Sequence, residues 1–486
     1  MHRRVEILSL NLASMIILIF AAFTTAIFLL LDFLLMYLSA IIFMQNPKIE
    51  DVSNDEKELI PDFKLPIISI LLPVYREEIT LPYLIESIAN SDYPKDKLDI
   101  RILVEHDDHP TIKTIMSLPY KAGQTDDSGT KYNLFGLPKT IRVWKGIEIQ
   151  IDYIYLNPPG ARTKPNSLNK GLANARGSIV TIYDAEDRPD PDQLRKAAVY
   201  MLKHPEVACV QARLSCYNSD QSLLTKLFSI EYIEHFLILL PALYSLKKVV
   251  LLGGTSNFIR IEVIRNLKGW KTDNVTEDAD LGVRLARLGY KVVPINSTTW
   301  EEATPKLYPW IRQRTRWNKG FLYTWSKHFK NPMRLIHDIG FSSTLFLFYY
   351  LIAPITYFIS IIGWILFLAY WINFVGILST EPLAGWIQEA YTANSVVFYA
   401  SILSFIFGIV YDPFVAAEAL FKQGDPYSLK KVKYVFLMPF YLYLQILPSI
   451  LAIIELFVKP KHWRKTYHGF SIKTNEEEEH PYDKYI

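Results

Sequence analysis

The sequence contains few cysteines and carries almost no net charge. Only Cys209 and Cys216 occur among 486 residues, which excludes a disulfide scaffold and a CxxC metal site. We expect both to be buried free thiols. The 52 Lys and Arg residues nearly balance the 49 Asp and Glu residues, giving a formal charge of +3, so no overall field favours nucleic acid. Because half of the residues are hydrophobic, a disordered chain is also excluded.

The apolar residues are concentrated in two zones around a more polar middle part. Residues 7–44 are almost wholly apolar and exceed the roughly 20 residues that span a bilayer. We therefore predict that residues 1–46 form one long transmembrane helix or a hairpin, followed by a polar linker, residues 47–64. Further apolar runs predict three or four transmembrane helices in residues 340–460, before a polar tail, residues 461–486.

Lys and Arg near these apolar runs indicate how the chain is oriented. They place the N-terminus, the loop around Lys430 and Lys431, and the tail around Arg464 on the cytoplasmic side. A single last span cannot have both of its flanks on one side, so the rule conflicts with itself here. We predict a multi-pass protein of the cell membrane with a cytoplasmic middle domain.

The middle part, residues 65–305, alternates strand and helix patterns. A buried aliphatic run, Ile67–Leu72, is followed by helical spacing from Ile79 to Ala89 and by a second strand, Leu98–Val104. This alternation predicts a mainly parallel, Rossmann-like α/β sheet with helices on its faces. We also predict a helix from Thr163 to Gly177, strands at 179–183 and 249–252, and a helix from Thr276 to Gly289.

Acidic residues follow three of these strands. They form the groups Glu77-Glu78, Glu105 to Asp108, and Asp184 to Asp187. Parallel strands end at one edge of a sheet, where such clusters repel one another unless a cation or a donor lies between them. Asp184 and Glu186 suit Mg²⁺ or Mn²⁺ bridging to phosphates. The alternative is a helix-capping cluster, a role that Asp187 fits.

Three further features have both a functional and a purely structural interpretation. Lys164 begins a helix and suits a diphosphate, or is a solvated lysine. Gly253-Gly254 allows a sugar to approach the backbone, or is a plain turn. Asp278 lies in a first helical turn, where the dipole stabilises its ionised form; it suits a general base, or caps the helix.

Aromatic residues recur every fourth position after Gln313. Trp317, Phe321, Trp325 and Phe329 alternate with Lys and Arg, which predicts that residues 306–339 form an amphipathic helix in the membrane interface. Residues 223–243 are a second candidate of this kind. Trp317 beside Arg316 also offers a platform for a sugar ring and a cation for a phosphate.

The order of these motifs resembles the membrane-integrated processive glycosyltransferases of family two, which include cellulose, hyaluronan, chitin and mannan synthases. The resemblance covers residues 65–330 by motif and is closest to the exopolysaccharide and glucomannan-type branch. It rests on EHDD at 105–108, DAE at 184–186, TED at 276–278 and QRTRW at 313–317. Two departures are Glu186, where the family usually has Asp, and EHDD in place of the common DDG or DDS.

The resemblance implies a GT-A domain that inverts the anomeric carbon of a UDP- or GDP-linked sugar, with Mg²⁺ or Mn²⁺, and elongates a glycan or glycolipid acceptor at the bilayer. Single addition to a lipid-linked acceptor is the alternative enzyme. A transporter with a nucleotide-binding domain is the alternative of another class, although no internal repeat supports it. The implied residues are Asp278 and Glu277 for catalysis; Tyr75, Glu77, Glu105, Asp107, Lys164 and Asp184 for the donor; Asp184 and Glu186 for the metal; and Gln313, Arg316 and Trp317 for the acceptor.

Overall fold

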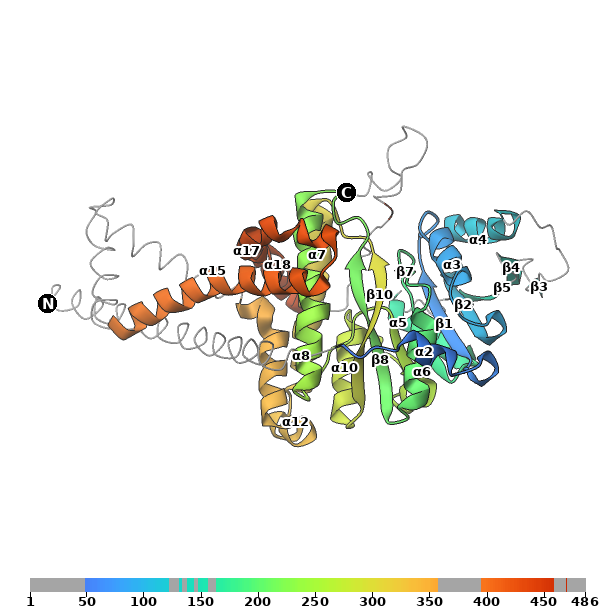
Figure 1. The fold of residues 1–486 in the computed structure, drawn as a ribbon, viewed down its shortest axis with the longest axis horizontal. Helices are drawn as coiled ribbons and strands as arrows, with labels where there is room; N and C mark the ends of the chain where they lie inside the picture. The colour runs from blue at the N-terminus through green and yellow to red at the C-terminus, as the bar shows by residue number, and fades with distance from the viewer. Residues whose placement is uncertain are drawn as a thin grey trace.

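The computed structural model describes residues 49–121, 131–132, 138–143, 147–155, 163–356, 395–458 and 469. The predicted N-terminal transmembrane segment, residues 357–394 of the predicted membrane region, and the C-terminal tail apart from Gly469 lie outside the described residues. In the described part, a sheet with helices on both faces adjoins a group of long helices (Figure 1).

The sheet is mixed and its long strand pairings are parallel. The central strand β1 (Ile68–Val74) lies between β2 (Leu98–Glu105) and β6 (Ile179–Ile182), and β2 in turn pairs with β5 (Ile147–Ile154). The described strands follow the order β3-β4-β5-β2-β1-β6-β9-β8-β10-β7, which confirms the predicted mainly parallel α/β sheet. The other strands are β3 (Lys131–Tyr132), β4 (Pro138–Val143), β7 (Arg188–Pro189), β8 (Val207–Cys216), β9 (Asn257–Arg260) and β10 (Lys291–Glu301).

Two hydrophobic layers hold helices on opposite faces of this sheet. Ile70 and Leu72 of β1 face a layer that includes α3 (Leu81–Ala89), whereas Leu71 faces a layer that includes α5 (Lys164–Asn174). This is the strict alternation of side chains along a strand. Helices α4 (His109–Lys121) and α6 (Gln193–Lys203) belong to the first layer, and α8 (Leu240–Ser245), α9 (Ile261–Asn266) and α10 (Glu277–Arg287) belong to the second. Shorter elements are α2 (Asn54–Glu58), η1 (Asp62–Lys64) and η2 (Lys95–Lys97).

Two predicted elements are corrected. Residues 249–252 are not a strand; they run extended against α10, where the backbone approaches Gly282 so closely that a Cβ there would lie 3.0 Å from the Val250 oxygen. The strand begins instead at Asn257. Helix α5 ends at Asn174, before Gly177. Gly177 lies where the backbone of β1 approaches closely, because a Cβ there would lie 2.6 Å from the Ile67 oxygen.

The long helices pack beside the far half of the sheet. The π-helix η5 (His235–Leu239) joins α7 (Leu223–Glu234) to α8. Both α7 and η5 pack against α15 (Ser395–Gln423), and the segment that starts at Val432 packs against α7 and α15. Both cysteines are buried and unpaired in β8, as predicted. The other helices are α11 (Leu307–His328), α12 (Pro332–Ile339), a helix at 341–356, α16 (Pro426–Leu429), η6 (Val432–Leu437), α17 (Met438–Tyr443) and α18 (Ile446–Val458).

The aromatic stripe of α11 packs against protein. Trp317 contacts Phe228 of α7, with ring centroids 6.3 Å apart, and Phe321 contacts Tyr350 at 5.8 Å. Trp325 lies 6.2 Å from Phe348. The stripe is therefore covered by α7 and the helix at 341–356 rather than exposed along its length.

The described residues contain fewer candidate membrane spans than the three or four predicted. One stretch, Val432–Val458, is long and apolar enough to cross a bilayer. A second candidate arises only if α12 and the helix at 341–356, which meet at 119°, are counted together. The multi-pass arrangement therefore lacks support in this part of the chain.

Candidate active site

The loops after β1 and β2 form one hydrogen-bonded unit at the edge of the sheet. Arg76 has a left-handed φ of 56°, and its N–H donates to Asp108 Oδ2 at 2.6 Å. The N–H of Glu77 donates to Thr111 Oγ1 at 3.0 Å, and the buried Glu77 carboxylate accepts from Thr80 Oγ1 at 2.8 Å. Asp108, which the motif alone did not single out, therefore fixes the loop that carries Tyr75 and Glu77.

Glu105 and Asp107, the two candidates for reading the base, differ in environment. Glu105 is the last residue of β2 and is buried, whereas Asp107 lies in the following turn and is exposed. Tyr75 stacks under the Arg76 guanidinium, whose carbon lies 5.3 Å from the ring centroid. The structure thus brings Tyr75, Glu77 and Glu105 to adjacent strand ends and leaves Asp107 accessible to solvent.

Lys164 connects three elements. Its Nζ lies 2.5 Å from Asp184 Oδ1, after β6, and donates to the Gly254 carbonyl oxygen at 2.8 Å. Burial disfavours the charged form of Lys164, but Asp184, Glu277 and Asp278 outweigh burial and hold its pKa above the usual range. Lys164 is therefore a charged residue amid carboxylates and not the solvated lysine of the alternative interpretation.

The carboxylates after β6 have different roles. Asp187 Oδ2 accepts the Asp184 N–H at 2.7 Å and the Thr255 hydroxyl, so Asp187 shapes the turn. Its role is structural, but it does not cap a helix as the alternative interpretation proposed, since the following helix α6 begins at Gln193 with Asp192 as its N-cap. Burial, and then the charge of Asp184, raise the pKa of Glu186 to about 8. Asp184 and Glu186 thus place two hard oxygen donors beside Lys164.

Glu277 and Asp278 approach the same cluster from the N-terminus of α10. Burial and the neighbouring Asp278 raise the pKa of Glu277 to about 7. Burial also raises the pKa of Asp278, against the Ala279 N–H, Lys164 and Arg316. A Cβ on Gly254 would lie 3.4 Å from Asp278 Oδ2 and 3.7 Å from Lys164 Nζ. The glycine turn therefore lies directly beside the side chains of Asp278 and Lys164.

Two acidic residues at the end of β10 were missed. Burial, Glu186 and Asp184 raise the pKa of Glu301 to about 8, and Glu302 is buried beside it. The sequence TTWEE at 298–302 could have indicated them, because it too places acidic residues at the end of a strand. We call Lys164 with Asp184, Glu186, Glu277, Asp278 and Glu301 the Lys164 site.

The Lys164 site offers few protein ligands to a cation. Among the described residues, no three His, Cys, Asp or Glu side chains are arranged to hold a metal ion. Asp184 and Glu186 supply carboxylate oxygens, and the raised pKa of Glu186 indicates that one of these carboxylates lacks a matching positive charge. This set fits a hard divalent cation that completes its coordination with phosphate oxygens and water.

The QRTRW motif directs its side chains to different places. Gln313 is buried and its Oε1 accepts from Thr304 Oγ1 at 3.4 Å. The positive charge of Arg316 partly offsets the burial that raises the pKa of Asp278, so Arg316 acts electrostatically on the Lys164 site. Trp317 lines a cavity between α7, α11 and α15. Helix α11 therefore joins the acidic cluster to this cavity.

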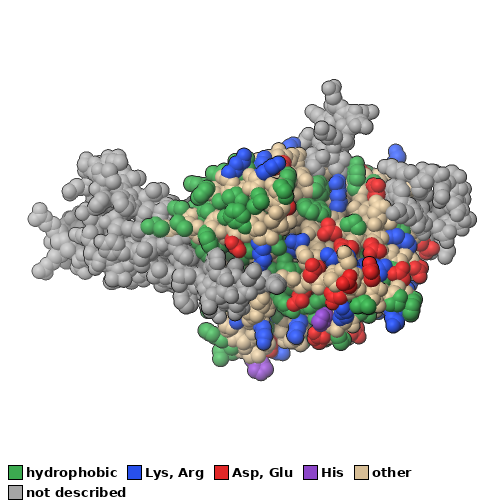
Figure 2. Space-filling view, in the orientation of Figure 1, with side chains coloured by type: hydrophobic (Ala, Val, Ile, Leu, Met, Phe, Trp, Pro, Cys, Tyr) green, Lys and Arg blue, Asp and Glu red, His purple; other side chains and the backbone are tan. Residues whose placement is uncertain are grey.

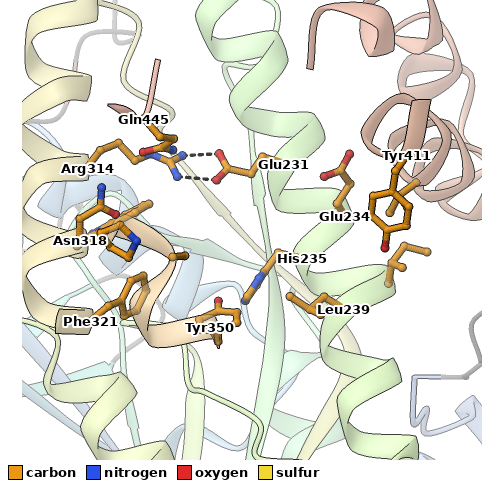
Figure 3. Close-up of a pocket in the computed structure, with 15 residues that line it drawn as sticks. Glu231, Glu234, His235, Leu239, Arg314, Asn318, Phe321, Tyr350, Tyr411 and Gln445 are labelled. Carbon is orange, nitrogen blue, oxygen red and sulfur yellow. Dashed lines mark hydrogen bonds and ion pairs between the residues drawn. The ribbon is translucent and has the colours of Figure 1, made fainter. Parts of the chain in front are cut away.

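This cavity, which we call the Trp317 cavity, has a volume of about 320 Å³ (Figure 3). Arg314 makes two 2.6 Å bonds to Glu231, whose Oε2 also accepts from the Tyr441 hydroxyl at 2.7 Å. Burial raises the pKa of Glu234 well above its usual range and lowers that of His235 to about 4. The remaining polar lining comes from Asn318, Tyr350, Tyr411 and Gln445.

The Trp317 cavity disfavours unpaired charge. Its ion pair is internally matched, and burial disfavours the charged forms of Glu234 and His235. Aromatic faces combined with hydroxyl and amide groups suit a polyhydroxyl ligand better than a phosphate.

Comparison with known proteins finds a matching family profile and several similar sequences. Residues 179–381 match the profile of glycosyl transferase family group 2. The chain is 26% identical over 295 residues to "Probable glycosyltransferase YdaM" of Bacillus subtilis, covering 59% of this chain and 64% of that protein. It is 25% identical over 277 residues to "Glucomannan 4-beta-mannosyltransferase 2" of Arabidopsis thaliana, covering 56% of this chain and 47% of that protein.

The fold has a counterpart among solved structures. The structure of the mannosyltransferase PcManGT from Pyrobaculum calidifontis, in complex with GDP-Man and Mn²⁺, superposes with a TM-score of 0.52. The two chains are 17% identical, and the alignment covers 90% of this chain and 99% of that one. At this identity the likeness concerns the fold.

Proposed function

We propose that this chain, which carries a glycosyltransferase family 2 domain, transfers a hexosyl group, by preference mannosyl, from a nucleotide-diphosphate sugar to a glycan hydroxyl with inversion. The observation that carries the proposal is the Lys164 site, where one partly buried lysine faces the carboxylates of three elements. The relatives named as mannosyltransferases and the fold neighbour bound to GDP-Man support GDP-mannose as the first donor to test.

The donor would occupy the ends of β1, β2 and β6. Tyr75, Glu77 and Glu105 or Asp107 would surround the nucleoside, with Lys164 directed at the diphosphate. Asp184 and Glu186 would hold Mn²⁺ or Mg²⁺, which supplies charge neutralisation for the departing diphosphate. The Mn²⁺ in the fold neighbour supports this assignment.

Asp278 would act as the general base, with Glu277 beside it. Its carboxylate takes the proton of an acceptor hydroxyl while that oxygen forms a bond to the anomeric carbon. The bond from this carbon to the diphosphate oxygen breaks, and its electron pair leaves with the diphosphate. Burial makes Asp278 more basic than a solvated aspartate, and general-base assistance contributes roughly a hundredfold to ten-thousandfold.

The acceptor would lie in the Trp317 cavity. Trp317 offers a face for a sugar ring, and Arg316 directs a cation toward Asp278 and the diphosphate. The volume of about 320 Å³ accommodates one or two sugar rings. Gln313 would serve the acceptor site indirectly, by holding α11 to the loop after β10, since its Oε1 accepts from Thr304 Oγ1.

Repeated addition with transfer of the product across a membrane is the further part of this proposal. It is supported by the apolar runs outside the transferase domain, including residues 7–44. Products of the purified protein separate this from the single-addition alternative. Long chains formed at a large excess of acceptor indicate processive synthesis, whereas products extended by one sugar contradict it.

The basic test is a donor screen on the purified full chain. GDP- and UDP-sugars are incubated with Mn²⁺ or Mg²⁺, and release of the nucleoside diphosphate and labelled product are measured, with and without EDTA. We expect turnover with at least one donor and its loss in EDTA. Absence of turnover with every donor, in a preparation that is folded, would overturn the proposed activity and favour transport or binding.

A further inference from the structure

We infer that residues 432–458, which comprise η6, α17 and α18, lie in the plane of a membrane surface and do not cross the bilayer. This segment is the one stretch of the described residues that qualifies as a membrane span by length and composition alone. The inference is independent of the donor and acceptor proposed above, because it concerns how the catalytic domain meets lipid.

One face of this segment is bonded to the catalytic domain along its length. Tyr441 donates to Glu231 of α7 at 2.7 Å. Further along, Asn318 of α11 donates to Ser449 Oγ at 3.1 Å, and Lys319 of α11 pairs with Glu455 at 3.0 Å. Tyr441 in α17, and Ser449 and Glu455 in α18, thus bond this segment to α7 and α11.

The opposite face is a row of exposed apolar side chains. Its most exposed members are Phe457 at 82%, Phe436 at 72% and Phe440 at 69%. A contiguous apolar surface of this kind indicates a partner or a lipid phase. Figure 2 shows hydrophobic side chains gathered where Figure 1 draws α15 and α17. The other exposed members of the row are Leu444, Leu447, Leu451, Ile454 and Val458.

Chain positions on both sides of the segment bond to the same edge of the sheet. Lys431, just before it, donates to Ser219 Oγ at 2.9 Å and to Ser229 Oγ at 3.1 Å. Gly469, eleven positions after Val458 in the sequence, donates its N–H to Glu302 Oε2 at 2.5 Å. Ser219 follows β8 and Glu302 follows β10, and these strands are parallel neighbours whose ends are in register. A spanning segment would place its two flanks on opposite sides of a core about 30 Å thick.

Charge points the same way. Helix α11, which packs against α18, carries the cations Arg312, Arg314, Arg316, Lys319 and Lys327. If the segment crossed the bilayer, these cations would be drawn to the same depth at a high cost in free energy.

A lipid surface fits the exposed face better than another protein does. Lys430 and Lys433 are exposed immediately before Phe436, and cations beside exposed aromatics are typical of an interfacial helix on anionic lipid. Gln445 of the same segment lines the Trp317 cavity. The arrangement therefore holds this cavity at the level of the membrane surface and removes the orientation conflict in the sequence, because the cations on both sides of the segment share one side of the bilayer.

The first test is topological and uses the full chain in sealed vesicles of known orientation. Cys209 and Cys216 are replaced by Ser, and single cysteines are introduced as Lys433→Cys, Asn475→Cys and, as a reference on the catalytic domain, Glu58→Cys. We expect a membrane-impermeant maleimide to label all three from the same side. Labelling of position 475 from the side opposite to positions 58 and 433 would show that the segment crosses, and would overturn the inference.

The second test measures contact with lipid. A fluorophore is attached to Phe440→Cys or to Leu59→Cys, which are 69% and 75% exposed in the native protein, in vesicles that contain phosphatidylglycerol and nitroxide-labelled lipid. We expect loss of emission at position 440 with shallow nitroxides, less with deep ones, and none at position 59. No quenching at position 440, or burial of position 440 by a second copy shown by cross-linking, would overturn the inference. Both tests can fail while transferase activity persists, so they are distinct from the donor screen.

Discussion

The Lys164 site and the Trp317 cavity adjoin through α11 but differ in electrostatic character. In the first, one lysine faces several carboxylates, three of which have pKa values raised to about 7 or 8. In the second, Arg314 and Glu231 neutralise each other and burial disfavours the charge of Glu234. Under the proposed function, the diphosphate with its cation belongs to the Lys164 site and the uncharged acceptor sugar belongs to the Trp317 cavity.

Loss of the proposed base should have the largest effect on the charged side. Asp278→Asn keeps the shape of the side chain but cannot accept the acceptor proton, so we expect transfer to fall roughly a hundredfold to ten-thousandfold. Donor affinity, measured by calorimetry, should change little. Glu262→Gln, on the exposed surface of α9, is the matched control. Near-native transfer by a folded Asp278→Asn variant would remove Asp278 from this role.

The two glutamates of the cavity should respond differently to the same change. Glu231→Gln leaves the buried Arg314 without its counter-charge, which we expect to destabilise the fold by about 3 kcal/mol. Glu234→Gln should alter stability by less than about 0.5 kcal/mol, because burial raises the pKa of Glu234 and the amide keeps the size and shape of the side chain. Thermal unfolding of both variants in detergent measures this. Equal losses of stability would contradict the difference between the ion-paired Glu231 and Glu234.

Removing the aromatic platform should affect the acceptor alone. Trp317→Ala loses a stacking surface, and we expect the KM for acceptor to rise about tenfold, equivalent to roughly 1.4 kcal/mol. The KM for donor should stay unchanged. Trp325→Ala, on the same helix but packed against Phe348, is the control and should lower stability without raising the acceptor KM. A rise in donor KM with Trp317→Ala would place the donor in the cavity.

The raised carboxyl pKa values predict how stability depends on pH without metal. Glu277 titrates at about 7, and Glu186 and Glu301 at about 8, all above the unfolded value near 4.5. The folded protein therefore binds more protons than the unfolded chain between these values, so stability is highest below pH 4.5 as far as these groups decide it. It should fall as the pH rises from about 4.5 and level off above about 8, by at most roughly 1.4 kcal/mol per pH unit for each carboxyl.

Melting temperatures across this range measure the effect. Mn²⁺ should restore stability more at pH 8 than at pH 5.5, because the ion binds the ionised carboxylates. Glu301→Gln should flatten the pH dependence. A melting temperature that does not change with pH would show that the carboxyl groups of the Lys164 site do not have raised pKa values in the folded protein.

The amino-acid sequence by itself determined the mainly parallel sheet, because aliphatic runs separated by amphipathic helices have few other ways to be buried. It also indicated that acidic groups after β1, β2 and β6 share one edge, since parallel neighbours end together. It did not indicate that Lys164 bonds both Asp184 and Gly254, or that Glu301 joins the cluster. Those contacts bring together residues far apart in the chain.

Tertiary structure alone decided which face of the segment Val432–Val458 packs against the rest of the protein. Hydropathy treats Val432–Val458 as one span, because it averages over the helix and does not register which face meets Arg314, Asn318 and Lys319. The aromatic stripe of α11 is similar: its period predicts an amphipathic helix, but the partner of the apolar face was set by the packing of α7 and the helix at 341–356. The periodicity of a helix predicts that one face is buried, and the rest of the fold determines which element covers that face.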